Sequence, residues 1–104
     1  MDVQRIAAFS HGANGGNPAG VVLCEALPAA EQMLTIAAEV GYSETVFAAP
    51  SEDGWRVRYF APEIEVPFCG HATIALGAAL ALAHGDGTFT LQLNDTRITV
   101  TGWR

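Results

Sequence analysis

The apolar positions of this chain fall into short runs separated by polar turns, a pattern typical of a domain with several strands. Val3–Phe9 and Gly20–Cys24 have the apolar content of buried strands. The segment between them is rich in Gly, Asn and Pro and predicts a loop. From Pro28 the apolar residues keep helical spacing up to Gly41, a residue type common just past a helix end. This part of the chain therefore predicts two strands and a helix.

The following segments predict two pairs of strands. Thr45–Ala48 is strand-like, and Trp55–Phe60 alternates with the period of two that a half-exposed strand requires. Ser51–Gly54 predicts the turn between them. Thr88–Leu93 and Arg97–Val100 predict a closing hairpin near the end of the sequence.

A run without charge lies between these two hairpins. Val66–Gly85 contains no Asp, Glu, Lys or Arg, and Thr73–Ala83 within it predicts a helix that is apolar on every face. Such a helix is normally buried on every face. Because helices and strands do not alternate one for one, we expect an α+β domain rather than a doubly wound parallel sheet. In this domain a curved, mixed or largely antiparallel sheet wraps around the buried central helix.

The length of the charge-free run raises a membrane-spanning helix as an alternative. Pro67 and Gly70 interrupt the run, and His71 and His84 bracket its strongly apolar part. A buried core helix explains the run better, so we expect no membrane association.

Composition narrows the possible partners and the compartment. Half of the 104 residues are apolar, which fits a single folded domain. Five basic against 11 acidic residues give a formal charge of −6, which speaks against nucleic acid and anionic membrane surfaces. Met1–Arg5 has neither the basic start nor the apolar core of a signal peptide. Cys24 and Cys69 show no disulfide framework spacing, so free thiols in a reducing cytoplasm are expected.

Candidate chemistry gathers where the charge-free helix begins. The N-terminus of a helix has unpaired N–H groups and a partial positive charge, which suit a carboxylate, and a cysteine there is biased toward thiolate. Cys69 is therefore a candidate acid/base thiol, although a free cysteine can equally be a small buried apolar residue. Cys69 and His71 form one Cys-x-His pair without a second pair at zinc-finger spacing, so we expect no metal site.

Two further segments carry polar groups that could act on a small ligand. Glu44 lies between two hydroxyl residues before an apolar strand and could be a general base, or simply a solvated loop carboxylate. Asn17 and Gly16 could contact a small ligand, or could only form a turn. The loop that holds them lacks both G-x-G-x-x-G and G-K-[ST], which argues against nucleotide binding.

Taken together, four segments form a family pattern. In order they are Gly16–Val22, Ser43–Phe47, Arg58–Glu63 and Phe68–Thr73. This pattern resembles the phenazine-biosynthesis isomerase (PhzF-like) family of the diaminopimelate-epimerase-like fold, over about residues 3 to 100. The resemblance implies two similar domains, each a curved sheet around a central helix, with the active site between them. It also implies cofactor-free proton transfer on a small amino or hydroxy acid.

The resemblance also implies roles for individual residues. Glu44 matches the acid/base glutamate of the family, and Cys69 aligns with one of the two opposed thiols of the epimerases and racemases of the fold. Having both leaves isomerisation and epimerisation open. The positions implied to bind substrate are Asn17, Gly70, His71, Ala72 and Thr73.

The resemblance covers one domain, 1–104, which matches the N-terminal half of a two-domain member. The second wall of the cleft would come from a domain after Trp103–Arg104, or from a second copy of the chain. We therefore expect a homodimer acting on a small carboxylate-bearing substrate. The alternative is a non-catalytic ligand-binding or remnant half-domain.

Overall fold

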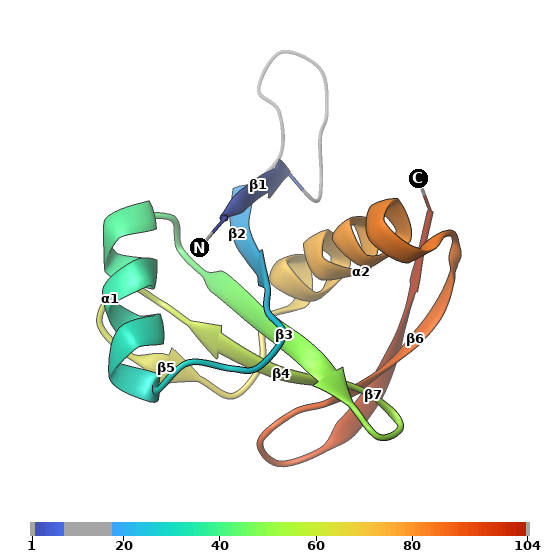
Figure 1. The fold of residues 1–104 in the computed structure, drawn as a ribbon. Coiled ribbons are helices and arrows are strands. Elements are labelled where there is room, and N and C mark those ends of the chain that lie inside the picture. The colour runs from blue at the N-terminus through green and yellow to red at the C-terminus, as the bar shows by residue number, and fades with distance from the viewer. Residues whose placement is uncertain (1, 8–17, 104) are drawn as a thin grey trace.

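The computed structural model describes residues 2–7 and 18–103, and Asn17 lies outside the described residues. The described part forms a mixed sheet with two helices, one on each of its faces (Figure 1). The fold class is α+β, as the sequence predicts. In chain order the elements are β1 (Gln4–Ala7), β2 (Pro18–Leu23), α1 (Ala30–Val40), β3 (Thr45–Ser51), β4 (Gly54–Phe60), β5 (Glu65–Val66), α2 (Gly70–His84), β6 (Gly87–Gln92) and β7 (Arg97–Gly102).

The strand order shows why this sheet is mixed. The order is β1-β2-β3-β4-β6-β7, and the short β5 pairs with β4. The β2/β3 and β4/β6 pairs are parallel, whereas the pairs made by hairpins are antiparallel. Parallel neighbours need a long crossover connection, and α1 and α2 lie in these two crossovers.

The period of two in β3 separates two apolar cores. Val46 and Ala48 pack with α2, whereas Phe47 packs with Met33 and Ala37 of α1. Because successive side chains of a strand point to opposite faces, the apolar side chains of β3 pack against both helices. In Figure 1, α2 lies within the curve of the sheet and α1 covers the outer face.

The central helix approaches the sheet closely through small residues. A Cβ on Gly77 would lie 2.9 Å from Cγ2 of Val100, and a Cβ on Gly102 would collide with the backbone carbonyl of Gly77. Glycine at both positions therefore lets the backbones of α2 and β7 approach closely. Ala75, Leu76, Ala79 and Leu80 are at most 1% exposed.

One prediction about this helix is wrong in part. Ile74 is 43% and Leu82 is 61% exposed, so α2 is not buried on every side in the single chain. These residues are spaced by multiples of four with Ala78 between them, which places them on one stripe of the helix. The sheet curves around the rest of α2 and leaves this stripe uncovered.

The elements differ from the sequence-based expectation mainly at their ends. The helix α2 begins at Gly70 rather than Thr73, β3 continues to Ser51, and the two-residue strand β5 is not predicted. Among the described residues, no helix has the length and apolar content needed to cross a membrane.

Candidate active site

Glu44 is held at the start of β3 by backbone contacts to β2. The N–H of Gly20 donates to the carbonyl oxygen of Glu44 at 3.2 Å. A Cβ on Gly20 would lie 2.9 Å from Oγ1 of Thr45 and 3.2 Å from Cγ1 of Val40, closer than normal packing allows. Glycine at this position therefore lets β2 approach the segment that carries Glu44.

Cys69 and His71 are placed by the first turn of α2. Cys69 is the N-cap, and both the N–H and the hydroxyl of Thr73 donate to its carbonyl oxygen, at 3.0 and 2.8 Å. The Thr73 hydroxyl also bonds the phenol of Tyr59 at 2.6 Å, and Tyr59 is only 1% exposed. Burial raises the pKa of Tyr59, so its phenol stays protonated as part of this scaffold. Both donors of Thr73 are thus used within the protein.

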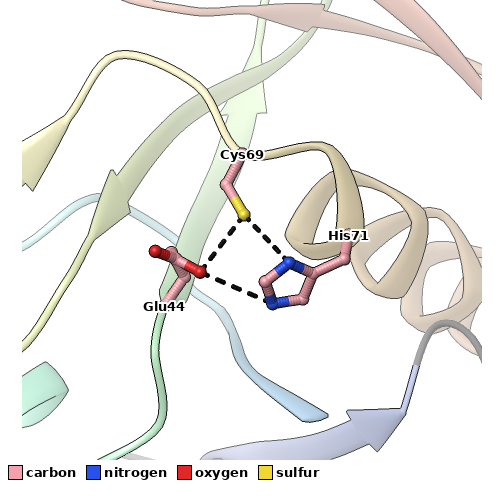
Figure 2. Close-up of side chains that lie close together, drawn as sticks. All are labelled: Glu44, Cys69 and His71. Carbon is pink, nitrogen blue, oxygen red and sulfur yellow. Dashed lines mark hydrogen bonds and ion pairs between the residues drawn. The ribbon is translucent and has the colours of Figure 1, made fainter. Parts of the chain in front are cut away.

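The three side chains that meet here come from two parts of the chain (Figure 2). The thiol of Cys69 donates to Oε1 of Glu44 at 3.3 Å and lies 3.3 Å from Nδ1 of His71. Nε2 of His71 lies 3.5 Å from the same carboxylate oxygen. The side chains of His71 and Glu44 are 15% and 20% exposed, so the cluster is largely sheltered but still reached by solvent. We call Glu44, Cys69 and His71 the acid/base cluster.

The protonation state of Cys69 corrects a sequence-based expectation. Burial raises the pKa of the thiol above its ordinary value, and the hydrogen bond and charge of Glu44 raise it further. The backbone N–H groups of Ala72 and His71 act in the opposite direction, but they do not outweigh these effects. The N-terminus of α2 therefore does not produce a thiolate, and Cys69 is a proton donor at neutral pH.

The other residues expected at the site lie around the start of α2. Gly70 is exposed and Ala72 is buried. Asn17, the remaining expected contact, lies outside the described residues. Phe68 is 53% exposed and packs edge-on against Tyr59, with ring centroids 5.9 Å apart. An exposed aromatic side chain thus lies next to the N-cap of α2.

His71, which the resemblance implies binds substrate, also contacts Glu44 and Cys69, and the sequence did not predict these contacts. The Cys-x-His spacing across a helix start is the signal that could have revealed one of these contacts, because it places both side chains near the first turn. The contact with Glu44 joins residues from different elements and has no local sequence signal.

Away from this cluster, a hollow of about 240 Å³ lies at the β3–β4 turn. Its lining includes Trp55, Thr90 and the ion pair of Asp53 with Arg97 at 3.7 Å. That hollow shares no lining residue with the acid/base cluster. The paired charges at its rim are largely exposed, so it offers no sheltered proton donor and acceptor.

The sequence is similar to bacterial proteins named isomerases. It is 52% identical over 79 residues to an uncharacterized isomerase of Deinococcus radiodurans, an alignment that covers 75% of this chain and 26% of that protein. It is 43% identical over 90 residues to the uncharacterized isomerase YddE of Escherichia coli K12, covering 86% of this chain and 30% of that protein. The chain thus spans less than a third of the length of these relatives.

Solved structures have the same fold. A PhzF-family phenazine biosynthesis protein from Bacillus anthracis superimposes with a TM-score of 0.83 at 34% identity, covering 95% of this chain and 34% of that chain. A protein described as a predicted epimerase from Pseudomonas aeruginosa superimposes with a TM-score of 0.89 at 23% identity, covering 98% of this chain and 38% of that one. At that identity the second likeness shows the fold alone.

A family model described as phenazine biosynthesis-like protein (PhzC-PhzF) matches residues 6–101. The match spans nearly the whole sequence, including the acid/base cluster and the helix start. This chain therefore belongs to the PhzC-PhzF family of phenazine biosynthesis-like proteins.

Proposed function

We propose that this chain provides one wall of an active site that moves a proton on the carbon skeleton of a small amino or hydroxy acid, without a cofactor. The observation that carries the proposal is the hydrogen bond between the Cys69 thiol and the Glu44 carboxylate at the N-terminus of α2. A carboxylate acceptor and a protonated donor, sheltered together, are the elements of general acid–base catalysis. The isomerase names of the relatives support the same reaction class.

The substrate carboxylate would bind at the start of α2. The N–H of Thr73 is already bonded to the carbonyl oxygen of Cys69, but the N–H groups before it in the first turn have no carbonyl partner within a helix, and the dipole favours an anion there. Gly70 is exposed, so a ligand can approach the backbone at this position. Donors fixed in this way also stabilise charge that develops on the carboxylate when a neighbouring carbon loses its proton.

The geometry of the acid/base cluster favours isomerisation over epimerisation by this wall alone. Epimerisation needs an acid and a base on opposite faces of one carbon. Cys69 and Glu44 are in direct contact at 3.3 Å, which leaves no room for a carbon between them. Glu44 is therefore proposed to take a proton from one carbon and return it to another on the same face. An opposed acid would have to come from a second wall.

We propose that a second copy of the chain provides this second wall. Phe68 lies next to the N-cap of α2, and Ile74 is on the following turn; they are 53% and 43% exposed. Leu82 is exposed on the same stripe of α2 as Ile74, so α2 presents large apolar side chains to solvent. Such a surface favours association, and a two-fold axis would bring two helix starts toward one cleft. A reducing compartment such as the cytoplasm suits this site, because its thiol must stay reduced.

A second candidate is a non-catalytic ligand-binding half-domain. The chain spans 26% and 30% of the length of two relatives named isomerases. A half-domain of this kind is favoured where the rest of such a relative carries groups that catalysis needs. Such a domain would bind a small carboxylate and leave its carbon-bound protons in place.

The test is a panel of small amino and hydroxy acids incubated with the protein in heavy water over a dilution series. The proposal expects deuterium on a carbon of at least one acid, with a rate per chain that falls as dimers dissociate. Ultracentrifugation over the same concentrations provides the oligomeric state. Binding of an acid without deuterium uptake at any concentration would support the half-domain and contradict the isomerase.

A further inference from the structure

We propose that Glu44, Cys69 and His71 form a binding site for a single thiophilic divalent cation, represented by Zn²⁺, and that the bound cation blocks proton transfer. The binding of the cation stands on the geometry of the cluster alone. The inhibition rests on the function proposed above.

The three side chains offer a sulfur, a nitrogen and an oxygen at suitable separations. One ligand atom from each lies within 4.8 Å of the others. The thiol sulfur is 3.3 Å from the Glu44 oxygen and 3.3 Å from Nδ1 of His71. A tetrahedral zinc ion with bonds of about 2.0–2.3 Å separates its ligand atoms by about 3.3–3.6 Å. The two separations from the sulfur already match this spacing closely, and the third is within 4.8 Å, so small side-chain movements would admit the ion.

The hydrogen bonding of His71 explains why a cation would suit this cluster. The thiol of Cys69 donates to Glu44, Nδ1 of His71 lies 3.3 Å from the sulfur, and Nε2 lies 3.5 Å from the same carboxylate oxygen. Nε2 is buried and has no hydrogen-bond partner among the described residues. A cation would accept lone pairs from the sulfur, the ring and the carboxylate, so that the ring of His71 gains the partner that it lacks here.

The charges and atoms balance when the cation binds. The thiol loses its proton to solvent as the Zn–S bond forms, so Cys69–SH and Zn²⁺ give Cys69–S–Zn⁺ and a proton. The Glu44 carboxylate supplies the second negative charge, and no electron is transferred. Coordination through Nδ1 would leave the ring proton on Nε2, directed toward Glu44, as metal-bound histidines commonly arrange it. Three protein ligands leave a fourth position open to water.

The cation would stop the proposed reaction directly. It would occupy the lone pair by which Glu44 accepts a proton and would displace the proton that Cys69 donates. Substrate binding at the N–H groups of α2 would still be possible, so we expect inhibition that substrate does not fully relieve.

Cobalt(II) titration of the chelator-treated protein tests the site, because a cobalt–thiolate bond absorbs light in the near ultraviolet. We expect this absorption to saturate at one ion per chain and to disappear on addition of Zn²⁺. Cys69→Ser should abolish it and His71→Gln should weaken affinity about tenfold or more. The matched controls are Cys24→Ser, the other free cysteine, and His84→Gln at the far end of α2, which should bind as the unchanged protein does. Circular dichroism checks that each variant is folded.

Several outcomes would overturn the proposal. Absence of the thiolate absorption, or its persistence in folded Cys69→Ser, would refute the site. If the ion binds but Zn²⁺ leaves deuterium exchange unchanged, the inhibitory role is refuted while the site stands. A protein that shows the absorption but exchanges no deuterium without metal would refute the proposed function and the inhibition with it, again leaving the cation site standing.

Discussion

The thiol of Cys69 donates to Oε1 of Glu44 at 3.3 Å, across 25 positions of sequence. The backbone of each residue is held by a different partner. The N–H of Gly20 donates to the carbonyl oxygen of Glu44, and Thr73 donates to the carbonyl oxygen of Cys69. The contact therefore depends on β2 and α2 being correctly placed on the same sheet. The carboxylate charge of Glu44 also favours the neutral form of the thiol, which raises the pKa of Cys69.

Alkylation of Cys69 measures that coupling. In a Cys24→Ser background, the rate with iodoacetamide should still be rising above neutral pH, because burial and Glu44 raise the pKa of the thiol. Adding Glu44→Gln should move the midpoint to lower pH, since it removes the charge while keeping an acceptor. A rate that has already reached its plateau at neutral pH would mean that Cys69 is a thiolate.

Gly102→Ala tests the close contact between α2 and β7. The new Cβ would collide with the carbonyl of Gly77, so we expect a loss of about 1–3 kcal/mol in the free energy of unfolding in urea. Gly87→Ala is the matched control, because a Cβ there meets nothing within 4 Å. Equal stability of the two variants would contradict the described packing.

The ion pair of Arg58 and Glu65 predicts a small loss of stability in acid. Arg58 donates to both carboxylate oxygens, at 2.8 and 2.6 Å, and this lowers the pKa of Glu65 in the folded protein. The stabilisation is therefore present above the unfolded pKa and is lost as the pH falls through the lower folded pKa. Because the side chains are about a quarter exposed, we expect at most about 1 kcal/mol.

The measurement is the unfolding free energy of the unchanged protein and of Glu65→Gln, at neutral pH and at about pH 3. The difference between the two proteins should shrink as the pH falls, because protonation of Glu65 removes the charge that Glu65→Gln lacks. A difference that stays constant would show that the charge of Glu65 does not stabilise the fold.

A substitution on the exposed stripe of α2 tests whether a second copy of the chain provides the second wall. Leu82→Ser should weaken self-association in ultracentrifugation, because Leu82 is 61% exposed on that stripe. Ile64→Ser is the control, since Ile64 is 63% exposed but lies on the loop before β5. A protein that is monomeric throughout, or equal effects of the two changes, would argue against a dimer formed through α2.

The sequence predicts the element order well because periodicity is local. The alternation in Trp55–Phe60 and the charge-free run before Gly85 each define an element without reference to the rest of the chain. Strand β5 has only two residues and gives no such periodicity. The exposed side of α2 also escapes prediction, because Ile74 and Leu82 are as apolar as the buried residues beside them.

The candidate site is also predicted only in part. The resemblance to the family predicts that Glu44 and the start of α2 belong to one site, and in the structure Glu44 contacts Cys69 there. The state of the thiol is not predictable in this way. A helix N-terminus is visible in sequence, whereas the burial of Cys69 and the approach of Glu44 depend on tertiary structure and reverse the expected shift.

The most direct test of the account is the rate of deuterium uptake into a responsive acid, compared between the unchanged protein and Glu44→Gln. We predict a loss of about 10²–10⁴-fold, with circular dichroism and acid binding preserved. The exposed control Glu63→Gln should keep the full rate, and Cys69→Ser, which can still donate to Glu44, should lose much less. A Glu44→Gln protein that exchanges deuterium at the unchanged rate, or a larger loss in Cys69→Ser, would contradict Glu44 as the base.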